Sequence, residues 1–142
     1  MIYISLFIFC LTLGTFFPFA SETYLITLLL SEKYNVLLLL LLASVGNIFG
    51  SVISWLFGYF INYFINKPWF PINKYLLQKA NSIFDKYGKW SLLLSWVPFI
   101  GDPIAFVAGS LRYKFILFII FISVGKFGRY LIIILFTNYY LN

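Results

Sequence analysis

Four long apolar blocks, separated by short polar segments, are the feature that most constrains the fold of this chain. They cover residues 2–31, 35–65, 90–111 and 113–137. Each is long enough to cross a hydrocarbon core of about 30 Å, which takes roughly 20 helical residues. Only 10% of all residues are charged, whereas a soluble domain has about a quarter. The sequence therefore predicts an all-α integral membrane protein, with residues 1–142 forming a single membrane domain.

Helix-breaking residues interrupt the first and third blocks, whereas the second and fourth run through without proline. They are Gly14 and Pro18 in the first block, and Pro98, Gly101 and Pro103 in the third. Broken backbone at membrane depth is tolerated only inside protein or beside water. We therefore expect residues 1–31 and 90–111 to form re-entrant helical hairpins, and residues 35–65 and 113–137 to form transmembrane helices.

Lysine residues crowd into the connection between the second and third blocks. Five lysines fall between residues 67 and 89, where Asp85 is the only acid. Apolar side chains recur there on one helical face, and Gly88 follows the last of them, which indicates a basic amphipathic helix lying in the membrane interface. A plain soluble connector helix is the alternative. An excess of Lys and Arg is typical of cytoplasmic loops that face anionic lipid headgroups, so no nucleic acid partner is expected.

Two short patterns recur between the halves of the chain. The prolines and acids of residues 18–22 and 98–102 match at a spacing of 80 residues. The tetrapeptides SVGN, at residues 44–47, and SVGK, at residues 123–126, match at a spacing of 79. Paired interrupted segments are a signature of inverted-repeat transporters. We predict an inverted internal repeat, in which each half is a re-entrant hairpin plus a transmembrane helix.

Charge also predicts the topology. If all four blocks crossed the membrane, Arg112 and Lys114 would lie on the side opposite the basic segment 67–89. Two re-entrant hairpins place both basic groups on one side, as the positive-inside rule prefers. We therefore expect one hairpin to enter from outside and the other from the cytoplasm, with both chain ends outside.

Four charged residues inside the apolar blocks form the candidate site. Glu22 and Asp102 lie four residues beyond their prolines, near the predicted hairpin tips. Lys126 and Arg129 lie about 20 Å into the last block by helical rise and share one helix face. Because a charge at membrane depth costs roughly 2.5–3.5 kcal/mol to insert, we expect the acids to pair with the bases.

The predicted cluster suits proton or cation exchange, or binding of a lipid phosphate. Lys126 and Arg129 are the expected phosphate contacts, since Arg offers a bidentate fork and Lys a point charge. A buried ion-pair lattice that only holds the hairpins together is the alternative. Neighbouring residues are expected to shape the hairpins and their packing. These are Pro18, Ser21, Gly46, Asn47, Pro98, Gly101, Pro103 and Gly125, with Gly50 and Gly128 also expected to allow close helix approach.

The chain has no histidine and a single cysteine, Cys10. Histidine-based catalytic triads, the usual histidine-containing zinc sites and an intramolecular disulfide are therefore excluded. No metal, cofactor or catalytic residue is predicted. An intramembrane enzyme acting on lipid phosphates is the weakest function considered, because no nucleophile–base pair is visible.

Three segments carry a family resemblance: KYGKWSLLLSWVPFIGDPIAFVAGSLRY, GKFGRY at residues 125–130 and FPFASE at residues 17–22. They resemble the YqaA-like branch of the DedA (VTT-domain, SNARE-associated) membrane protein superfamily. The resemblance covers nearly the whole chain. It implies two facing re-entrant hairpins in a multi-pass protein of the bacterial inner membrane. It also implies flippase-type movement of a polyprenyl phosphate or of phosphatidylethanolamine, with or without coupling to protons or cations. Glu22 matches the acid of the family's first hairpin.

The second hairpin departs from the family pattern. Typical members carry two arginines there, at positions that match Ser95 and Gly101, whereas this chain has Asp102 at the tip and its bases in the following helix. We predict a small lipid transporter with alternating access to a polar site between two hairpins. Its expected partners are membrane lipids and, in a homodimer, a second copy. A non-transporting structural or assembly factor, whose intramembrane charges serve folding, is the alternative.

Overall fold

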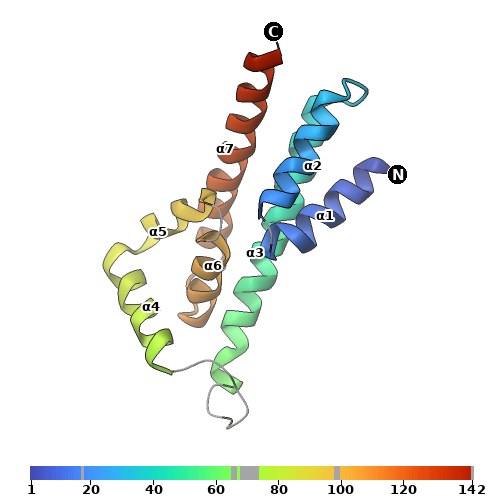
Figure 1. Cartoon of the computed structure of the whole chain (residues 1–142). Helices are drawn as coiled ribbons and strands as arrows, with labels where there is room; N and C mark the ends of the chain where they lie inside the picture. Colours follow the sequence, from blue (N-terminus) through green and yellow to red (C-terminus); the bar gives the residue numbers. More distant parts are fainter. Residues whose placement is uncertain (17, 65–66, 68–73, 98–99, 142) are drawn as a thin grey trace.

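All regular secondary structure in the computed structural model is helical over the residues that it describes, which are 1–16, 18–64, 67, 74–97 and 100–141. This confirms the all-α prediction. The elements are α1 (Ile2–Phe16), α2 (Pro18–Leu30), α3 (Val36–Phe64), α4 (Lys74–Tyr87), α5 (Lys89–Leu93), the 3-10 turn η1 (Leu94–Trp96), α6 (Gly101–Ser110) and α7 (Phe115–Leu141). In Figure 1, α1 and α2 lie on one side of the long helices α3 and α7, and α4 lies on the other.

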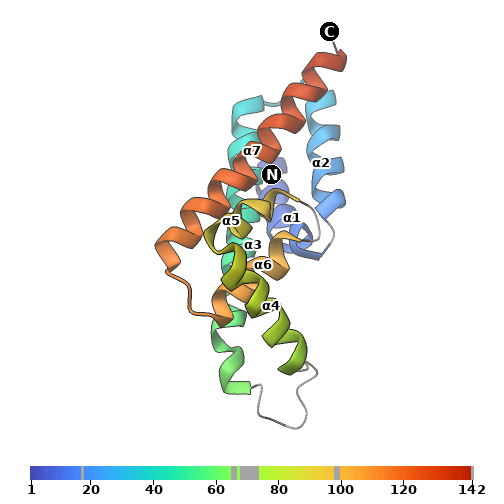
Figure 2. The same ribbon diagram turned by 90° about the vertical axis from the view of Figure 1, so that its left-hand side faces the viewer.

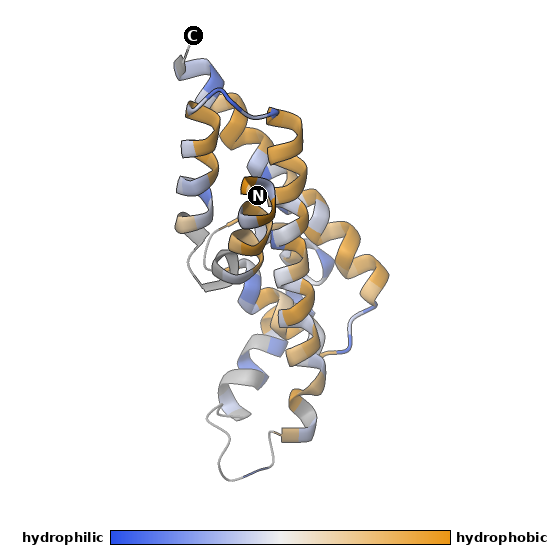
Figure 3. Cartoon of the chain, turned by 90° about the vertical axis from the view of Figure 1, so that its right-hand side faces the viewer, coloured by the Kyte–Doolittle hydropathy of each residue, from blue (hydrophilic) through white to orange (hydrophobic). Residues whose placement is uncertain are grey.

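The long helices α3 and α7 match the two uninterrupted blocks. Residues Val36–Ile61 and Phe115–Tyr140 are each long and apolar enough to cross a membrane. Asn35 caps α3, because its side-chain oxygen accepts hydrogen bonds from the backbone N–H groups of Leu37 and Leu38, at 2.9 and 3.3 Å. Apolar residues dominate both helices, and polar residues gather at the turns and in a few places at mid-height (Figure 3).

The first interrupted block forms a V. Helices α1 and α2 diverge from a point at mid-height of the molecule (Figure 1). Helix α1 runs through Gly14, so the predicted interruption at Gly14 is wrong. Pro18 is the first residue of α2, a position where the missing N–H removes no intrahelical bond.

The second interrupted block forms another V, from α5 and η1 on one side and α6 on the other. In Figure 2, α5 lies against α7, while α4 extends toward the lower end. Gly101 begins α6 and packs closely on the incoming arm, since a Cβ there would lie 2.6 Å from the Ser95 carbonyl oxygen. Pro103 lies in the first turn of α6 and so begins this helix instead of breaking it. Pro98 lies outside the described residues.

The two V-shaped units end in turns of the same backbone form. Among the described residues, Glu32 and Arg112 are the non-glycine residues with positive φ, at 51° and 53°. The N–H of Glu32 donates to the carbonyl of Leu29 (3.2 Å), and the N–H of Arg112 donates to that of Gly109 (2.9 Å). Glu32 and Arg112 are 80 residues apart, the spacing at which the prolines and acids recur.

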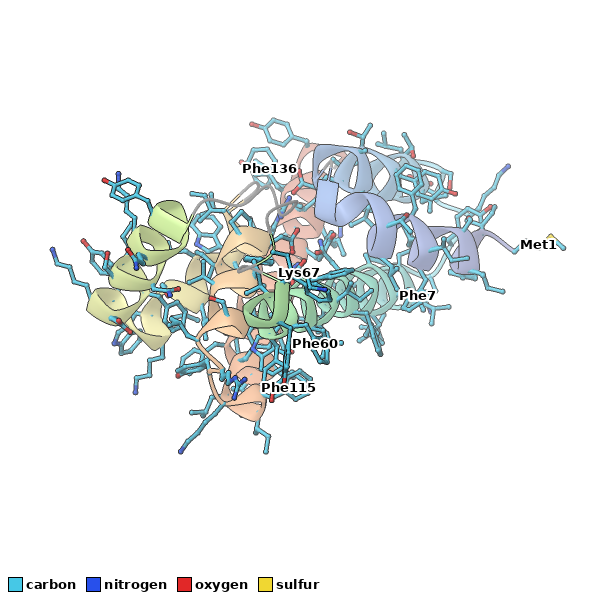
Figure 4. The ribbon with its side chains drawn as sticks, turned by 90° about the horizontal axis from the view of Figure 1, so that it is seen from below. Met1, Phe7, Phe60, Lys67, Phe115 and Phe136 are labelled. Carbon is cyan, nitrogen blue, oxygen red and sulfur yellow. The ribbon has the colours of Figure 1, made fainter. Side chains whose placement is uncertain are left out.

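The amphipathic helix α4 is shorter than the basic segment that contains it. It ends before Gly88, whose φ is 55° and whose N–H donates to the Phe84 carbonyl at 2.6 Å, as expected for a glycine at this position. Phe84 is buried, whereas Lys79, Asp85 and Lys86 are exposed. Seen from below, long side chains with nitrogen tips radiate from α4 away from the bundle (Figure 4).

Two apolar clusters form the core, with a polar layer between them along α3 and α7. One consists of Leu6, Cys10, Leu25, Leu28, Leu29, Leu39, Leu40, Ala43, Tyr130 and Ile134. The other consists of Trp55, Phe84, Leu92, Ala105, Ala108, Phe118 and Ile122. Asn47 and Ser51 of α3, with Lys126 and Arg129 of α7, are buried polar residues of the layer between them.

Helices α3 and α6 approach each other so closely that each needs a glycine. A Cβ at Gly58 would overlap the backbone carbonyl of Phe106, and a Cβ at Gly109 would overlap that of Trp55. This reciprocal contact makes α6 the helix most extensively packed on α3. The first V has no equally close contact with α7 among the described residues.

Besides Gly101, two further glycines predicted to support packing do so. A Cβ at Gly46 would lie 2.8 Å from the carbonyl oxygen of Phe7 in α1, and one at Gly125 would lie 2.6 Å from the hydroxyl oxygen of Ser95. The same prediction is wrong for Gly128, where a Cβ would meet open space. The difference arises because Gly46 and Gly125 lie on helix faces that contact a neighbouring helix, whereas Gly128 does not.

Candidate functional site

The four charged residues predicted from the sequence come together in the polar layer. Glu22 lies near the start of α2, Asp102 in the first turn of α6, and Lys126 and Arg129 on one face of α7. Lys126 lies about 17 Å into α7 by helical rise. The cluster is therefore at the middle depth of a helix long enough to cross a membrane.

Glu22 and Arg129 form a tight ion pair between α2 and α7. Nε of Arg129 donates to Oε1 of Glu22 at 2.6 Å, and Nη2 of Arg129 donates to the same oxygen. Arg129 is 8% exposed and Glu22 is 18% exposed. Charge-assisted hydrogen bonds from two guanidinium nitrogens make this the stronger of the two pairs.

Asp102 and Lys126 form a looser pair between α6 and α7. Nζ of Lys126 lies 3.7 Å from Oδ1 of Asp102, while the hydroxyl of Ser51 donates to that oxygen at 3.0 Å. The hydrogen bonds of Lys126 go instead to Asn47, through its backbone carbonyl at 2.9 Å and its side-chain Oδ1. Asn47 therefore solvates the buried ammonium, and Asp102 balances its charge from a longer distance.

Tyr130 and Ser21 extend the polar network toward α2. The amide of Asn47 donates to the hydroxyl of Tyr130 at 2.7 Å, and this tyrosine is fully buried. Ser21, also fully buried, hydrogen-bonds the same tyrosine. The network connects α2, α3, α6 and α7. Its two acids and two bases neutralise each other, so the net charge of +6 is carried by residues outside the cluster.

Sequence reasoning found the charged residues but missed part of their surroundings. Ser51 and the role of the Tyr130 hydroxyl were not predicted. Ser51 follows Asn47 by four residues in an apolar helix, so both side chains lie on one face. That spacing was the signal that could have revealed Ser51. Within the described ranges, no group of three or more His, Cys, Asp or Glu side chains could hold a metal ion.

Comparison with known proteins adds named relatives. The chain is 34% identical over 119 residues to the inner membrane protein YqaA of Escherichia coli (strain K12), covering 82% of this chain and 78% of that protein. The same values hold for the inner membrane protein YqaA of Shigella flexneri. An uncharacterized protein of Haemophilus influenzae is 32% identical over 135 residues, covering 90% of this chain and 82% of its own length. No protein-family profile and no solved structure matches the chain.

Proposed function

This chain belongs to the YqaA-like branch of the DedA family of membrane proteins, and on that basis we propose that it is a transporter of the bacterial inner membrane that moves a phosphate-bearing lipid through the buried charge cluster. The observation that carries the proposal is the electroneutral network of two acids and two bases at mid-depth. Charged residues at that depth are costly and mark substrate or ion pathways. The proposed partners are membrane lipids, and no catalytic chemistry is proposed.

We propose that both V-shaped units are re-entrant hairpins. Helices α1, α2 and α6 are about 22, 20 and 15 Å long by helical rise, too short for a core of about 30 Å. The guanidinium carbon of Arg112 lies 5.1 Å from the ring centroid of Tyr59, near the end of α3 that leads to Lys67. Arg112 and the start of the basic segment 67–89 thus lie at one end of the molecule, which is the arrangement that the hairpin topology predicts.

Cysteine labelling tests this topology. In a Cys10→Ala background, cysteines at positions 32, 67 and 112 would be exposed to an impermeant maleimide added to one side of sealed vesicles. The hairpin topology predicts that positions 67 and 112 react from the same side and position 32 from the other. Labelling of 67 and 112 from opposite sides would end the topology.

The proposed inverted duplication has support in the backbone. Each V leads into a long helix through a turn whose left-handed residue is Glu32 or Arg112, 80 residues apart. Gly46 of α3 packs against α1, and the corresponding Gly125 of α7 packs against the end of α5 and η1. These correspondences involve the same positions in both proposed halves.

The geometry suggests how substrate and protons could be coupled. Oε1 of Glu22 holds the fork of Arg129 that two phosphate oxygens would otherwise bind. Protonation of a carboxylate removes its charge and frees its partner base. A lipid phosphate and a proton therefore enter the cluster together without a net change in its charge. They leave together when the carboxylate loses its proton and pairs with its base again.

Lipid flipping in liposomes tests the proposed function. Purified protein should accelerate exchange of a fluorescent phospholipid between leaflets. Glu22→Gln and Arg129→Lys should slow it by tenfold or more, since a lost transition-state hydrogen bond of about 1.4 kcal/mol already gives a factor of ten. Glu32→Gln, at an exposed turn, is the matched control and should flip lipid normally. Normal flipping by both cluster variants would overturn the proposal.

A structural or assembly role is the second candidate, because the tight Glu22–Arg129 pair joins α2 to α7, which otherwise touch over a small area. If the charges serve folding alone, Asp102→Asn combined with Lys126→Met should keep full cellular function. Each single variant should lose protein from the membrane. A double variant that accumulates normally but has no function would reject this role.

A further inference from the structure

An apolar groove of about 590 Å³ runs along α3 between α1 and α6. Its walls are Leu11, Thr12, Gly50, Ile53, Ser54, Phe57, Phe60, Ile61, Phe64, Asp102, Pro103 and Phe106. Asp102 is the only charged residue among them. The groove extends from the buried charge cluster toward the end of α3, where Phe64 is the last helical residue.

Asp102 presents a carboxylate to this groove while its partner base stays hidden. Asp102 is 16% exposed, whereas Lys126 is 3% exposed and does not line the groove. The contacts that Ser51 and Lys126 make with Asp102 both fall on Oδ1. Among the described residues, Oδ2 of Asp102 is therefore left for a ligand in the groove.

Asp102 is the less tightly held of the two acids. Lys126 is 3.7 Å from Oδ1 and donates its hydrogen bonds to Asn47. A carboxylate that lines an apolar groove, and whose counter-ion donates its hydrogen bonds elsewhere, can accept a cationic ligand from the groove. Arg129, the other base of the cluster, is held by Glu22, and Lys67 lies at the far end of the groove, 5.3 Å from the ring of Phe64. Phe64 lies about 20 Å from Ser51 by helical rise. Lys67, beside Phe64, is therefore too far away to neutralise Asp102, beside Ser51.

We infer that this groove binds a single-chain lipophilic amine, with its ammonium group on Asp102 and its alkyl chain along Ile53, Phe57 and Phe60. The inference goes beyond lipid-phosphate movement and does not depend on it. An anionic headgroup is disfavoured in this groove, because it would meet the exposed carboxylate before it met either buried base. The lipid phosphate proposed above would bind Arg129, which does not line the groove. The volume is in the range of sites for one small ligand, roughly 300–1,000 Å³, so a two-chain lipid would leave one chain outside.

Protection of a cysteine in the groove tests the inference. Phe57, 69% exposed and on the groove wall, would be replaced by cysteine in a Cys10→Ala background. The protein would be placed in phosphatidylcholine nanodiscs and its alkylation by a maleimide followed. Decylammonium, decanol and decyl sulfate would be compared, since they share one chain and differ in head charge. Decylammonium should protect at concentrations about tenfold lower than decanol, a factor equivalent to ~1.4 kcal/mol.

Two controls locate the effect. Asp102→Asn should reduce protection by decylammonium to that by decanol, while Asp85→Asn, an exposed acid of α4, should leave it unchanged. A cysteine at Ile132, on the exposed face of α7, should not be protected by any of the three. The ligand series is read on a protein that retains Asp102, so it remains decisive even if Asp102→Asn does not fold.

Three results would overturn the inference. Equal protection by decanol and decylammonium would show partition into an apolar surface without recognition of charge. Stronger protection by decyl sulfate would show that the groove accepts anions. Protection that appears when phosphatidylethanolamine is added to the nanodiscs, without decylammonium, would assign the groove to a two-chain aminophospholipid instead.

Discussion

The two ion pairs of the polar layer have the same kinds of charge but different surroundings. Arg129 holds Glu22 with two nitrogens, Nε at 2.6 Å and also Nη2, whereas Nζ of Lys126 lies 3.7 Å from Oδ1 of Asp102. Asp102 lines a groove of about 590 Å³, and Glu22 is not among the described residues that line it. The first pair therefore resembles a clamp between helices, and the second resembles a site whose acid is available for exchange.

The two V-shaped units explain why the pairs differ. Helix α6 is held on α3 by the reciprocal contacts of Gly58 and Gly109, so its position does not depend on an ion pair. Helix α2 touches α7 over a small area, and the Glu22–Arg129 pair is the main polar contact between them. Where packing fixes a V-shaped unit, its charged residue is not needed to hold the helices together.

Breaking the clamp should have the largest effect. Arg129→Met leaves Glu22 without its partner, and we expect a loss of about 3 kcal/mol, at the low end for a broken buried pair because Glu22 is 18% exposed. Thermal unfolding in detergent measures the loss. Glu22→Met combined with Arg129→Met removes both charges and should be more stable than Arg129→Met alone. If the double variant is the less stable of the two, the clamp interpretation fails.

Crowding the contact between α3 and α6 should have the next largest effect on stability. Gly58→Ala places a Cβ on the backbone carbonyl of Phe106, which has no side-chain freedom to yield, and overpacking of this kind costs about 1–3 kcal/mol. Gly128→Ala, in open space on α7, should change stability by less than about 0.5 kcal/mol. Unfolding of both variants in one detergent compares them. Equal stability would mean that α6 is not held by this contact.

The sequence was sufficient to predict which charged residues form the buried cluster, because the cost of a charge in an apolar run does not depend on tertiary structure. It was also sufficient for the two long helices, whose apolar blocks nearly match α3 and α7. It could not decide whether Asp102 faces Lys126 or Arg129. That choice depends on how far α6 is rotated against α7, and the structure gives Lys126.

Other features depend on surfaces that are distant in the sequence. Gly58, Gly109 and Gly128 all lie in apolar helices, yet two of them are essential to packing and one faces open space. The groove combines residues of α1, α3 and α6, none of which signals a cavity by itself. The re-entrant hairpins and the inverted repeat stay predictions, since they require the position of the membrane.

Neutralising Asp102 should have a smaller effect on stability. Asp102→Asn leaves Lys126 with both oxygens of Asn47 and keeps an oxygen that can accept from Ser51. We expect a loss of about 1 kcal/mol, because these hydrogen bonds remain and only the charge interaction with Lys126 at 3.7 Å is lost. The same unfolding measurement applies. A loss as large as that for Arg129→Met would show that both pairs are clamps.

Chemical modification compares the two acids without changing the sequence. A hydrophobic carbodiimide reacts with protonated carboxyl groups that it can reach from an apolar phase, and the groove leads to Asp102 but not to Glu22. The reagent should therefore label Asp102 faster than Glu22, with mass spectrometry reporting the site. Asp102 labelling should fall when decylammonium is present and Glu22 labelling should not. Labelling of Glu22 at the same pH and rate as Asp102 would remove the distinction between a clamp and an exchangeable acid.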